Sequence, residues 1–209
     1  MARYTEAVCR VCRRAGEKLG LKGSRCLTPK CAMERRNRPP GKQHMTRQRR
    51  LSDRGVQLRE KQKARYTYGI LERQFKRIFT KAEKQTGVTK DNLLVALERR
   101  LDNIVYRLGF ADSRRQARQL VRHGLITVNG KRVDIPSYLV DEGDTIGWTQ
   151  SSTRSEYYKQ LAQTIKSKVV ASWLSLDKDN LVGQVLSLPT PDQIDVKFDG
   201  KSIVEYYSR

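Results

Sequence analysis

The chain lacks any long apolar run, and this limits where it can reside. No stretch of 18 consecutive apolar residues occurs among its 209 residues, whereas a membrane-spanning helix needs about 20. The first residues, MARYTEAVCRVCRR, also lack the apolar segment of a secretory signal. We therefore expect a cytoplasmic protein that does not associate with a membrane.

Sequence signatures of catalysis are missing as well. The chain contains no P-loop, no HExxH metalloprotease motif and no G-x-S-x-G nucleophile motif. Its two histidines, His44 and His123, lie far apart in the sequence. These absences predict that the protein is not an enzyme.

Acidic residues are scarce, and the excess of basic residues is uneven. The chain has 43 Lys and Arg but 22 Asp and Glu, a net charge of +21. Residues 1–80 hold 23 basic and 6 acidic residues, a net of +17, against +3 for residues 81–149 and +1 for residues 150–209. Nucleic acid is the expected partner, because Lys and Arg release the counterions condensed on its phosphates. An anionic membrane is less favoured, since the basic segment lacks a clean amphipathic helix.

Cysteine is absent after residue 31, and the four cysteines before it form two close pairs. The pairs have the patterns Cys-x2-Cys and Cys-x4-Cys and are separated by thirteen residues: Cys9, Cys12, Cys26 and Cys31. This spacing suits a tetrahedral thiolate site, and zinc suits four soft ligands. With no open coordination position, the predicted zinc ion is structural. An iron–sulfur cluster uses the same ligands and remains the alternative. Two disulfides are disfavoured in the cytoplasm, and unrelated free thiols would not cluster in this way.

Two amphipathic helices are predicted in the middle of the chain. Apolar residues recur at intervals of three and four between Leu94 and Leu108, and Gly109 is placed to end this first helix. Ser113 and Gln116 form a capping-box pattern at the start of the second helix, which Gly124 ends.

A tight β-hairpin is predicted directly after the second helix. Asn129-Gly130 separates Ile126–Val128 from Lys131–Val133, and Asn-Gly is the strongest short signal for a type I′ turn.

The second helix carries its arginines on one face. They fall within an arc of about 100° opposite Ala117, Leu120 and Val121. Because a solvated face normally mixes signs and this arc contains no acid, an RNA-binding face is favoured over a solvated one. The four residues are Arg114, Arg115, Arg118 and Arg122.

This segment resembles the RNA-binding module named after ribosomal protein S4. The resemblance runs through RLDNIVYRLGF at 100–110, SRRQARQLV at 113–121 and ITVNG at 126–130. The module also occurs in other proteins, including pseudouridine synthases and some tRNA synthetases. It therefore implies binding to structured RNA, and the flanking sequence must decide the rest.

The segment before the module is basic and then helical. Pro39-Pro40-Gly41 predicts a bend, and Ser52 or Asp53 can cap a helix that follows. The aromatic residues beyond it have helical spacing, which favours packing in a helical core over stacking on bases. They are Tyr66, Tyr68, Phe75 and Phe79.

The flanking segments resemble the S4 family of small-subunit ribosomal proteins. The resemblance includes RRLSD at 49–53, VQLREKQK at 56–63, YGILERQF at 68–75, WLSLD at 173–177 and the ending IVEYYSR. The cysteine-bearing start is similar to that of some bacterial members. The chain departs from the family pattern at an inserted Lys42 and at Tyr66, where a basic residue is common.

The resemblance implies an α+β fold in four parts. We expect a zinc knuckle and basic arm at 1–45, a helical domain at 46–97, and an inserted S4-type α/β module at 98–160. Within the module we expect two helices, the hairpin and further short strands. Residues 161–209 are expected to pack back on the helical domain.

The resemblance also implies a structural role in the ribosome. Such a protein is a monomer that binds small-subunit ribosomal RNA, nucleates assembly at the 5′ domain and neighbours proteins S5 and S3. It lines the messenger RNA entry channel and, with S5, contributes to translational accuracy. The rival interpretations are an S4-module RNA-modifying enzyme, which would need a large catalytic domain, and a free-standing RNA-binding regulator.

The candidate RNA-binding residues fall into two groups. For ribosomal RNA they are Arg10, Arg13, Arg14, Arg35, Arg36, Arg54, Arg59, Lys61, Lys63, Arg65, Arg114, Arg115, Arg118, Arg122, Lys131 and Arg132. For messenger RNA they are Arg47, Arg49 and Arg50.

Overall fold

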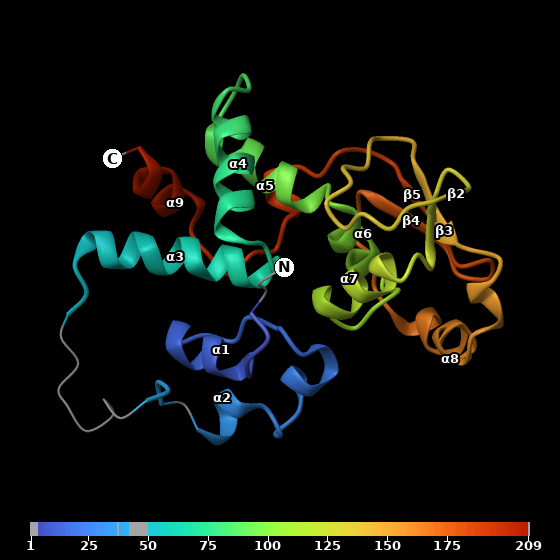
Figure 1. Cartoon of the computed structure of the whole chain (residues 1–209), viewed down its shortest axis with the longest axis horizontal. Helices are drawn as coiled ribbons and strands as arrows, with labels where there is room; N and C mark the ends of the chain where they lie inside the picture. The colour runs from blue at the N-terminus through green and yellow to red at the C-terminus, as the bar shows by residue number, and fades with distance from the viewer. Residues whose placement is uncertain (1–3, 37, 42–49, 209) are drawn as a thin grey trace. The chain divides into compact units, whose positions relative to one another are not determined.

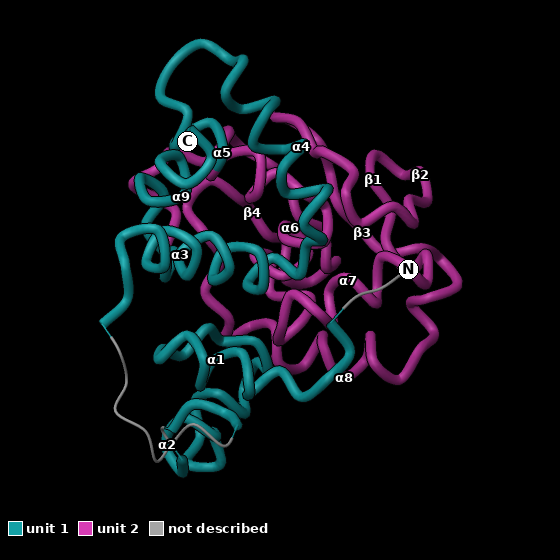
Figure 2. Tube along the Cα trace, turned by 60° about the vertical axis from the view of Figure 1, so that its left-hand side comes forward, with its two compact units in different colours: residues 1–93, 196–209 teal, residues 94–195 magenta. Residues whose placement is uncertain are grey.

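The chain folds into two compact units. The computed structural model describes residues 4–36, 38–41 and 50–208. The first unit joins residues 1–93 with 196–209, and the second comprises residues 94–195 (Figure 2). Helices and an antiparallel sheet are both present, in agreement with the predicted mixed α and β composition.

The first unit is helical in its described residues, and its last helix comes from the end of the chain (Figure 1). Its elements are α1 (Cys9–Ala15), η1 (Gly23–Leu27), α2 (Ala32–Arg35), α3 (Asp53–Thr67), α4 (Glu72–Glu83), the start of α5 (Thr89–Glu98) and α9 (Gly200–Tyr207).

Helix α9 packs against α3 and α4. The Gln57 amide donates a hydrogen bond to the Glu205 carboxylate at 2.8 Å, and the Tyr207 ring centroid lies 4.6 Å from that of Phe79. Tyr68, Phe75 and Phe79 are buried, as their helical spacing predicted. Tyr66, predicted with them, is only partly buried and packs against the cluster around α1. The end of the chain thus completes the core that the aromatic residues of α3 and α4 begin.

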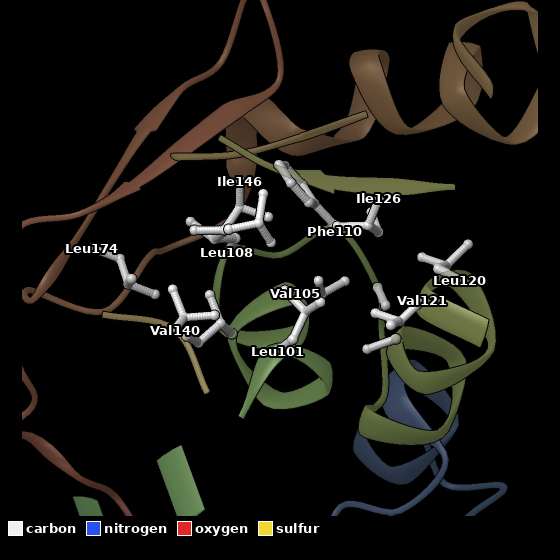
Figure 3. Close-up of a cluster of buried hydrophobic side chains, with 14 of the residues drawn as sticks. Leu101, Val105, Leu108, Phe110, Leu120, Val121, Ile126, Val140, Ile146 and Leu174 are labelled. Atoms are coloured by element: carbon white, nitrogen blue, oxygen red, sulfur yellow. The ribbon is translucent and has the colours of Figure 1, made fainter. Parts of the chain in front are cut away.

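The second unit packs helices against a five-stranded antiparallel sheet of order β2-β1-β3-β5-β4. Side chains of α6 and α7 point toward the strand residues Ile126 and Ile146 (Figure 3). The elements of this unit are the end of α5, α6 (Leu101–Arg107), α7 (Arg114–Arg122), β1 (Ile126–Val128), β2 (Lys131–Arg132), β3 (Thr145–Trp148), η3 (Ser152–Arg154), α8 (Glu156–Thr164), η4 (Ile165–Ser167), β4 (Leu174–Asp177), β5 (Val182–Val185) and η5 (Pro191–Gln193).

The predicted cap and turn of the second unit are present. Ser113 Oγ accepts a hydrogen bond from the Gln116 amide at 3.3 Å, which begins α7. Gly124 has a φ of 67°, and the Leu125 N–H donates to the Leu120 carbonyl, so a Schellman motif ends the helix. Asn129 and Gly130 have φ values of 50° and 76°, as a type I′ turn requires.

The prediction of one helix between Leu94 and Leu108 is wrong in one respect, because two helices, α5 and α6, cover this segment. Arg100 has an extended backbone, with φ −67° and ψ 136°, and it separates α5 from α6. The Leu101 N–H donates to the Tyr138 carbonyl, and the Val140 N–H donates to the Arg99 carbonyl. Pairing with a distant segment therefore replaces local helix hydrogen bonds at this point.

Candidate nucleic-acid interface

Helix α7 carries the arginines that the sequence placed on one face, and they differ in exposure. Arg115 and Arg122 are exposed. The side chains of Arg114 and Arg118 are 16% and 15% exposed, and each contacts a buried carboxylate. The predicted face therefore has two exposed members and two that are held against the body of the unit.

Glu98 is the first of these buried carboxylates. Arg107 binds it through two hydrogen bonds, Nε to Oε2 at 2.8 Å and a terminal nitrogen to Oε1 at 2.9 Å. The Asn103 amide donates to Oε2 at 2.8 Å and accepts from Arg114 Nε at 2.7 Å. The Arg114 guanidinium also lies 3.8 Å from Glu98 and 4.6 Å from the centre of the Tyr106 ring. Glu98 thus orients arginines of both α6 and α7.

Asp102 holds the second pair of arginines. Arg100, which is 1% exposed, binds it through Nε at 3.1 Å and a terminal nitrogen at 2.8 Å. Arg118 reaches the same carboxylate from α7 at 2.9 Å. We call Glu98, Asp102 and Asn103, with Arg100, Arg107, Arg114 and Arg118, the arginine brace.

The buried carboxylates of Glu98 and Asp102 need the arginine partners that the arginine brace supplies. An unpaired carboxylate in a protein interior is very costly, and a guanidinium that donates two hydrogen bonds is its best partner. Arg114 and Arg118 are thereby fixed along α7 instead of sampling many rotamers. Sequence reasoning missed the acids and Arg107. Their signal was present, because Glu98 and Asp102 interrupt the apolar stripe at helical spacing.

The hairpin adds basic residues beside the end of α7. Lys131 and Arg132 are exposed. A Cβ built on Gly124 would lie only 2.2 Å from Arg132 Nε. The positive φ of Gly124 favours glycine at this position, and the flexible Arg132 guanidinium lies directly over it. The turn brings Arg132 to the end of the helix that carries Arg122.

Four arginines of the first unit surround a hollow of about 450 Å³. Its lining contains no acidic residue: Arg10, Arg13, Arg36, Arg38 and Pro39–Gly41. Arg13 donates to the Arg38 carbonyl at 3.3 Å, which ties α1 to the segment that follows α2. Arg38 was not predicted, although it stands between Arg36 and the predicted bend. Arg10 also pairs with Glu6, an exposed acid outside the lining, at 3.3 Å. Clustered guanidinium groups suit phosphates.

The basic residues of α3 have unequal surroundings. Arg54 and Arg59 are exposed. Lys61 is 3% exposed, donates to Glu72 at 2.6 Å and has its Nζ 4.7 Å from the centre of the Tyr206 ring. A phosphate could reach Lys61 only if its neighbours moved.

Two further predicted residues of α3 are also held by acids. Lys63 lies 2.9 Å from Glu17 and 2.8 Å from Glu60. Burial lowers the pKa of Lys63, but hydrogen bonds and charges from the two glutamates outweigh it and leave the pKa raised. Arg65 lies 3.9 Å from Glu72, and its guanidinium is 4.4 Å from the centre of the Tyr66 ring.

The remaining predicted RNA contacts lie near the bend. Arg35 and Arg36 are exposed, as is Arg50. Arg47 and Arg49, assigned to messenger RNA, lie outside the described residues, as does the inserted Lys42.

The four cysteines share one neighbourhood in the first unit. Cys12 and Cys31 are buried. Burial is the main cause of a raised Cys12 pKa, a hydrogen bond from the Leu19 backbone opposes it, and the charges of Cys26, Cys9 and Cys31 raise it further. The Lys22 N–H donates to Cys26 Sγ at 3.3 Å. The donor set fits zinc chemically. Within the described ranges, however, no three Cys, His, Asp or Glu side chains form a group that could hold a metal ion.

Family models match most of the chain. A model described as ribosomal protein S4/S9 N-terminal domain matches residues 3–98, and one described as S4 domain matches residues 99–146. Over 209 residues the chain is 56% identical to small ribosomal subunit protein uS4 of Dehalococcoides mccartyi and 55% identical to that of Pelotomaculum thermopropionicum. The Thermus thermophilus protein of the same name is 54% identical. Each alignment covers 100% of both chains.

The chain belongs to the uS4 family of small ribosomal subunit proteins. The prediction of a structural ribosomal protein instead of an enzyme is confirmed, and so is its location in the cytoplasmic ribosome. The rival interpretation as an RNA-modifying enzyme or a free-standing regulator is not favoured, because full-length relatives carry the uS4 name. In the part of the chain that the structure describes, no helix is both long and apolar enough to span a bilayer.

Proposed function

We propose that this uS4 protein binds small-subunit ribosomal RNA directly and nucleates assembly at the 5′ domain. The observation that carries the proposal is the arginine brace, which fixes Arg114 and Arg118 beside the exposed Arg115 and Arg122. The mechanism is recognition of shape, because the deep major groove of duplex RNA hides its bases from side chains. Oriented guanidinium groups bind phosphates in pairs of hydrogen bonds, so their spacing selects a backbone geometry.

The first unit supplies a second set of phosphate contacts in this proposal. The hollow lined by Arg10, Arg13, Arg36 and Arg38 and the excess charge of residues 1–80 support it. Two separate basic surfaces on one chain would allow a monomer to bind two helices of an RNA junction. Such binding would hold the junction in the arrangement that later proteins recognise.

We further propose the finer roles that the family resemblance implies. Arg47, Arg49 and Arg50 would face messenger RNA at the entry channel, and the exposure of Arg50 is consistent with this role. Neighbouring proteins S5 and S3 would complete the site, and the contact with S5 would influence translational accuracy.

Sedimentation and salt titration test the RNA-binding proposal. The protein should sediment with small subunits and bind an RNA fragment of the 5′ domain with an affinity that falls steeply as salt rises. Arg115→Gln with Arg122→Gln should weaken binding. Lys159→Gln with Lys166→Gln removes the same charge from exposed residues of α8 and η4 and is the matched control. Protein that stays free in gradients, or binding that does not respond to salt, would contradict the proposal.

We also propose that Cys9, Cys12, Cys26 and Cys31 bind one structural zinc ion. The sequence spacing of the two cysteine pairs supports this assignment, as does the nearness of Cys9, Cys26 and Cys31 to Cys12, whose pKa they raise. Elemental analysis of the purified chain should find one zinc, lost in Cys12→Ser with Cys31→Ser. Iron with visible absorbance would favour a cluster instead.

A further inference from the structure

An apolar cavity lies in the first unit between α1 and α3. Its volume is about 220 Å³. Val11, Ala15 and Leu19 line it from the segment around α1, and Leu58 and Gln62 line it from α3. Cys9 and Cys12 are not among its lining residues, so the cavity is separate from the predicted zinc ligands.

Two tyrosines form one side of this cavity. Tyr4 and Tyr66 line it, and their rings meet edge to face with centroids 5.5 Å apart. The two rings give the cavity an aromatic wall.

The rim of the cavity is positively charged. Arg10, Arg14 and Arg59 line it and are exposed, and Lys63 lines it while held by Glu17 and Glu60. Arg10 lies 3.3 Å from Glu6, an exposed acid outside the lining. No ion pair is found for Arg14 or Arg59 among the described residues. The lining itself contains no acidic residue.

One buried side-chain polar atom of the described lining residues lacks a partner. The side-chain oxygen of Gln62 is buried without a hydrogen bond. A buried acceptor in this state destabilises the folded protein. The terminal amide turns easily because its last torsion is broad. A donor placed in the cavity could then pair with it.

We propose that the cavity binds an unpaired nucleotide of RNA, with the base against Tyr4 and Tyr66 and the flanking phosphates at Arg14 and Arg59. The apolar floor removes the base from water, the exocyclic amino group of A, C or G donates to Gln62, and the rim neutralises the backbone. This inference rests on the proposed RNA-binding function and adds a site for single-stranded RNA to it.

The aromatic wall and the buried Gln62 oxygen favour RNA over a protein segment. An acidic peptide with apolar side chains would also suit an apolar cavity with arginines around it. However, a peptide helix or strand presents carbon side chains that need no acceptor, whereas a base presents both a flat apolar face and donors at its edge. The aromatic wall and the unpaired Gln62 oxygen each match the base.

Short single-stranded RNA with one central 2-aminopurine tests the site on the full-length chain. Binding should change the 2-aminopurine fluorescence. Ala15→Leu fills the cavity without altering charge and should weaken binding at least about tenfold, near the low end for loss of one stacked base. Ala7→Leu, an exposed alanine outside the lining, is the control and should bind like the wild type. Equal affinity of Ala15→Leu and wild type would overturn the inference.

A second variant keeps the test valid if Ala15→Leu fails to fold. Arg14→Gln with Arg59→Gln changes only exposed side chains and should lower the salt slope by about 1.4, the value for two phosphate contacts on a single strand. An unchanged salt dependence of RNA binding would contradict the proposed phosphate contacts of Arg14 and Arg59.

Two further binding measurements distinguish a failure of this inference from a failure of the proposed RNA-binding function. If a short peptide of alternating Glu and Leu binds more tightly than the RNA and displaces it, the site belongs to a protein partner and the inference is wrong. If the wild type binds the 5′-domain fragment but not the short RNA, the inference alone fails. If it binds neither, the proposed function fails too.

Discussion

Lys61 and Arg59 lie two residues apart on α3 and have opposite surroundings. Arg59 is exposed, whereas Lys61 lies on the buried side with Gln57, Ala64 and Tyr68. Those positions follow the intervals of four and three residues that define one helix face. A lysine on such a face keeps its charge only with a partner. Glu72 is that partner, and its carboxylate also accepts a hydrogen bond from Tyr207 at 3.0 Å.

The pair predicts an acid-dependent stability. Burial raises the Glu72 pKa, but the hydrogen bond and charge of Lys61, the hydrogen bond of Tyr207 and the charge of Arg65 outweigh it, so the pKa is lowered from its ordinary value. A lowered folded-state pKa stabilises the protein above the unfolded value and loses this effect as pH falls through the folded value. Glu72→Gln should therefore be less stable than wild type at pH 7, with the difference shrinking below about pH 4.

Thermal melts over that pH range check this prediction. Glu83→Gln, an exposed change on the same helix, is the control and should follow the wild-type curve. A Glu72→Gln deficit that stays constant down to acid pH would show that packing, not charge, accounts for the loss.

At the scale of elements, local chemistry predicted more than long-range pairing did. The Ser113 cap, the glycine at 124 and the Asn129-Gly130 turn depend on residues near one another in sequence, and each was predictable. The break at Arg100 was not, because it depends on hydrogen bonds with residues 138–140. A stripe of apolar residues indicates which face of a helix is buried. It does not indicate that hydrogen bonds to a distant extended segment will replace the hydrogen bonds of one helical turn.

The sequence predicted that the arginines of α7 share one face, but it did not predict which residues hold two of them in place. The spacing placed Arg114 and Arg118 on one side of α7 without showing the acids of α5 and α6 beneath them. Glu98 and Asp102 come from other helices, so no window along α7 contains the signal. The same limit applies to Lys61, whose buried position depends on α9 at the far end of the chain.

Removing the charge of Glu98 tests whether the arginine brace positions α7 for RNA. Glu98→Gln raises the net charge by one, and electrostatics alone would then strengthen RNA binding. Because Arg107 and Arg114 lose the carboxylate that orients them, we expect affinity for the 5′-domain fragment to fall. We also expect the free energy of unfolding to drop by about 3–5 kcal/mol, as when one member of a buried ion pair is removed.

The exposed acid Glu142 supplies the matched control for this experiment. Glu142→Gln adds the same charge to the second unit and should strengthen binding slightly without loss of stability. If folded Glu98→Gln, verified by circular dichroism, also bound more tightly, the arginine brace would serve stability alone.

At the scale of the whole molecule, the two units differ in charge and in chain continuity. Most of the net charge lies in residues 1–80 of the first unit, whereas the antiparallel sheet lies in the second unit, which is the continuous segment 94–195. The first unit is discontinuous, because residues 196–209 return to it after the second unit is complete. The Gln57–Glu205 and Tyr207–Glu72 hydrogen bonds join segments more than 130 residues apart.

Truncation of the last segment should affect the two units unequally. Deleting residues 196–209 removes α9 from the core of the first unit and exposes Phe75 and Phe79, so backbone amides of α3 and α4 should exchange with deuterium faster. Amides of β1, β3 and β5 should keep their protection, because their sheet lies wholly in the second unit. Hydrogen exchange with mass spectrometry measures both. Equal loss of protection in the two units would show that they unfold together.

The return of α9 to α3 also has a consequence for the order in which the two units can fold. Synthesis produces residues 1–93 first, then the whole second unit, and only then residues 196–209. The first unit therefore cannot reach its final fold until the segment that carries α9 has been made. The most basic part of the chain thus waits, with the aromatic core of α3 and α4 incomplete, for a helix that is made more than 100 residues later.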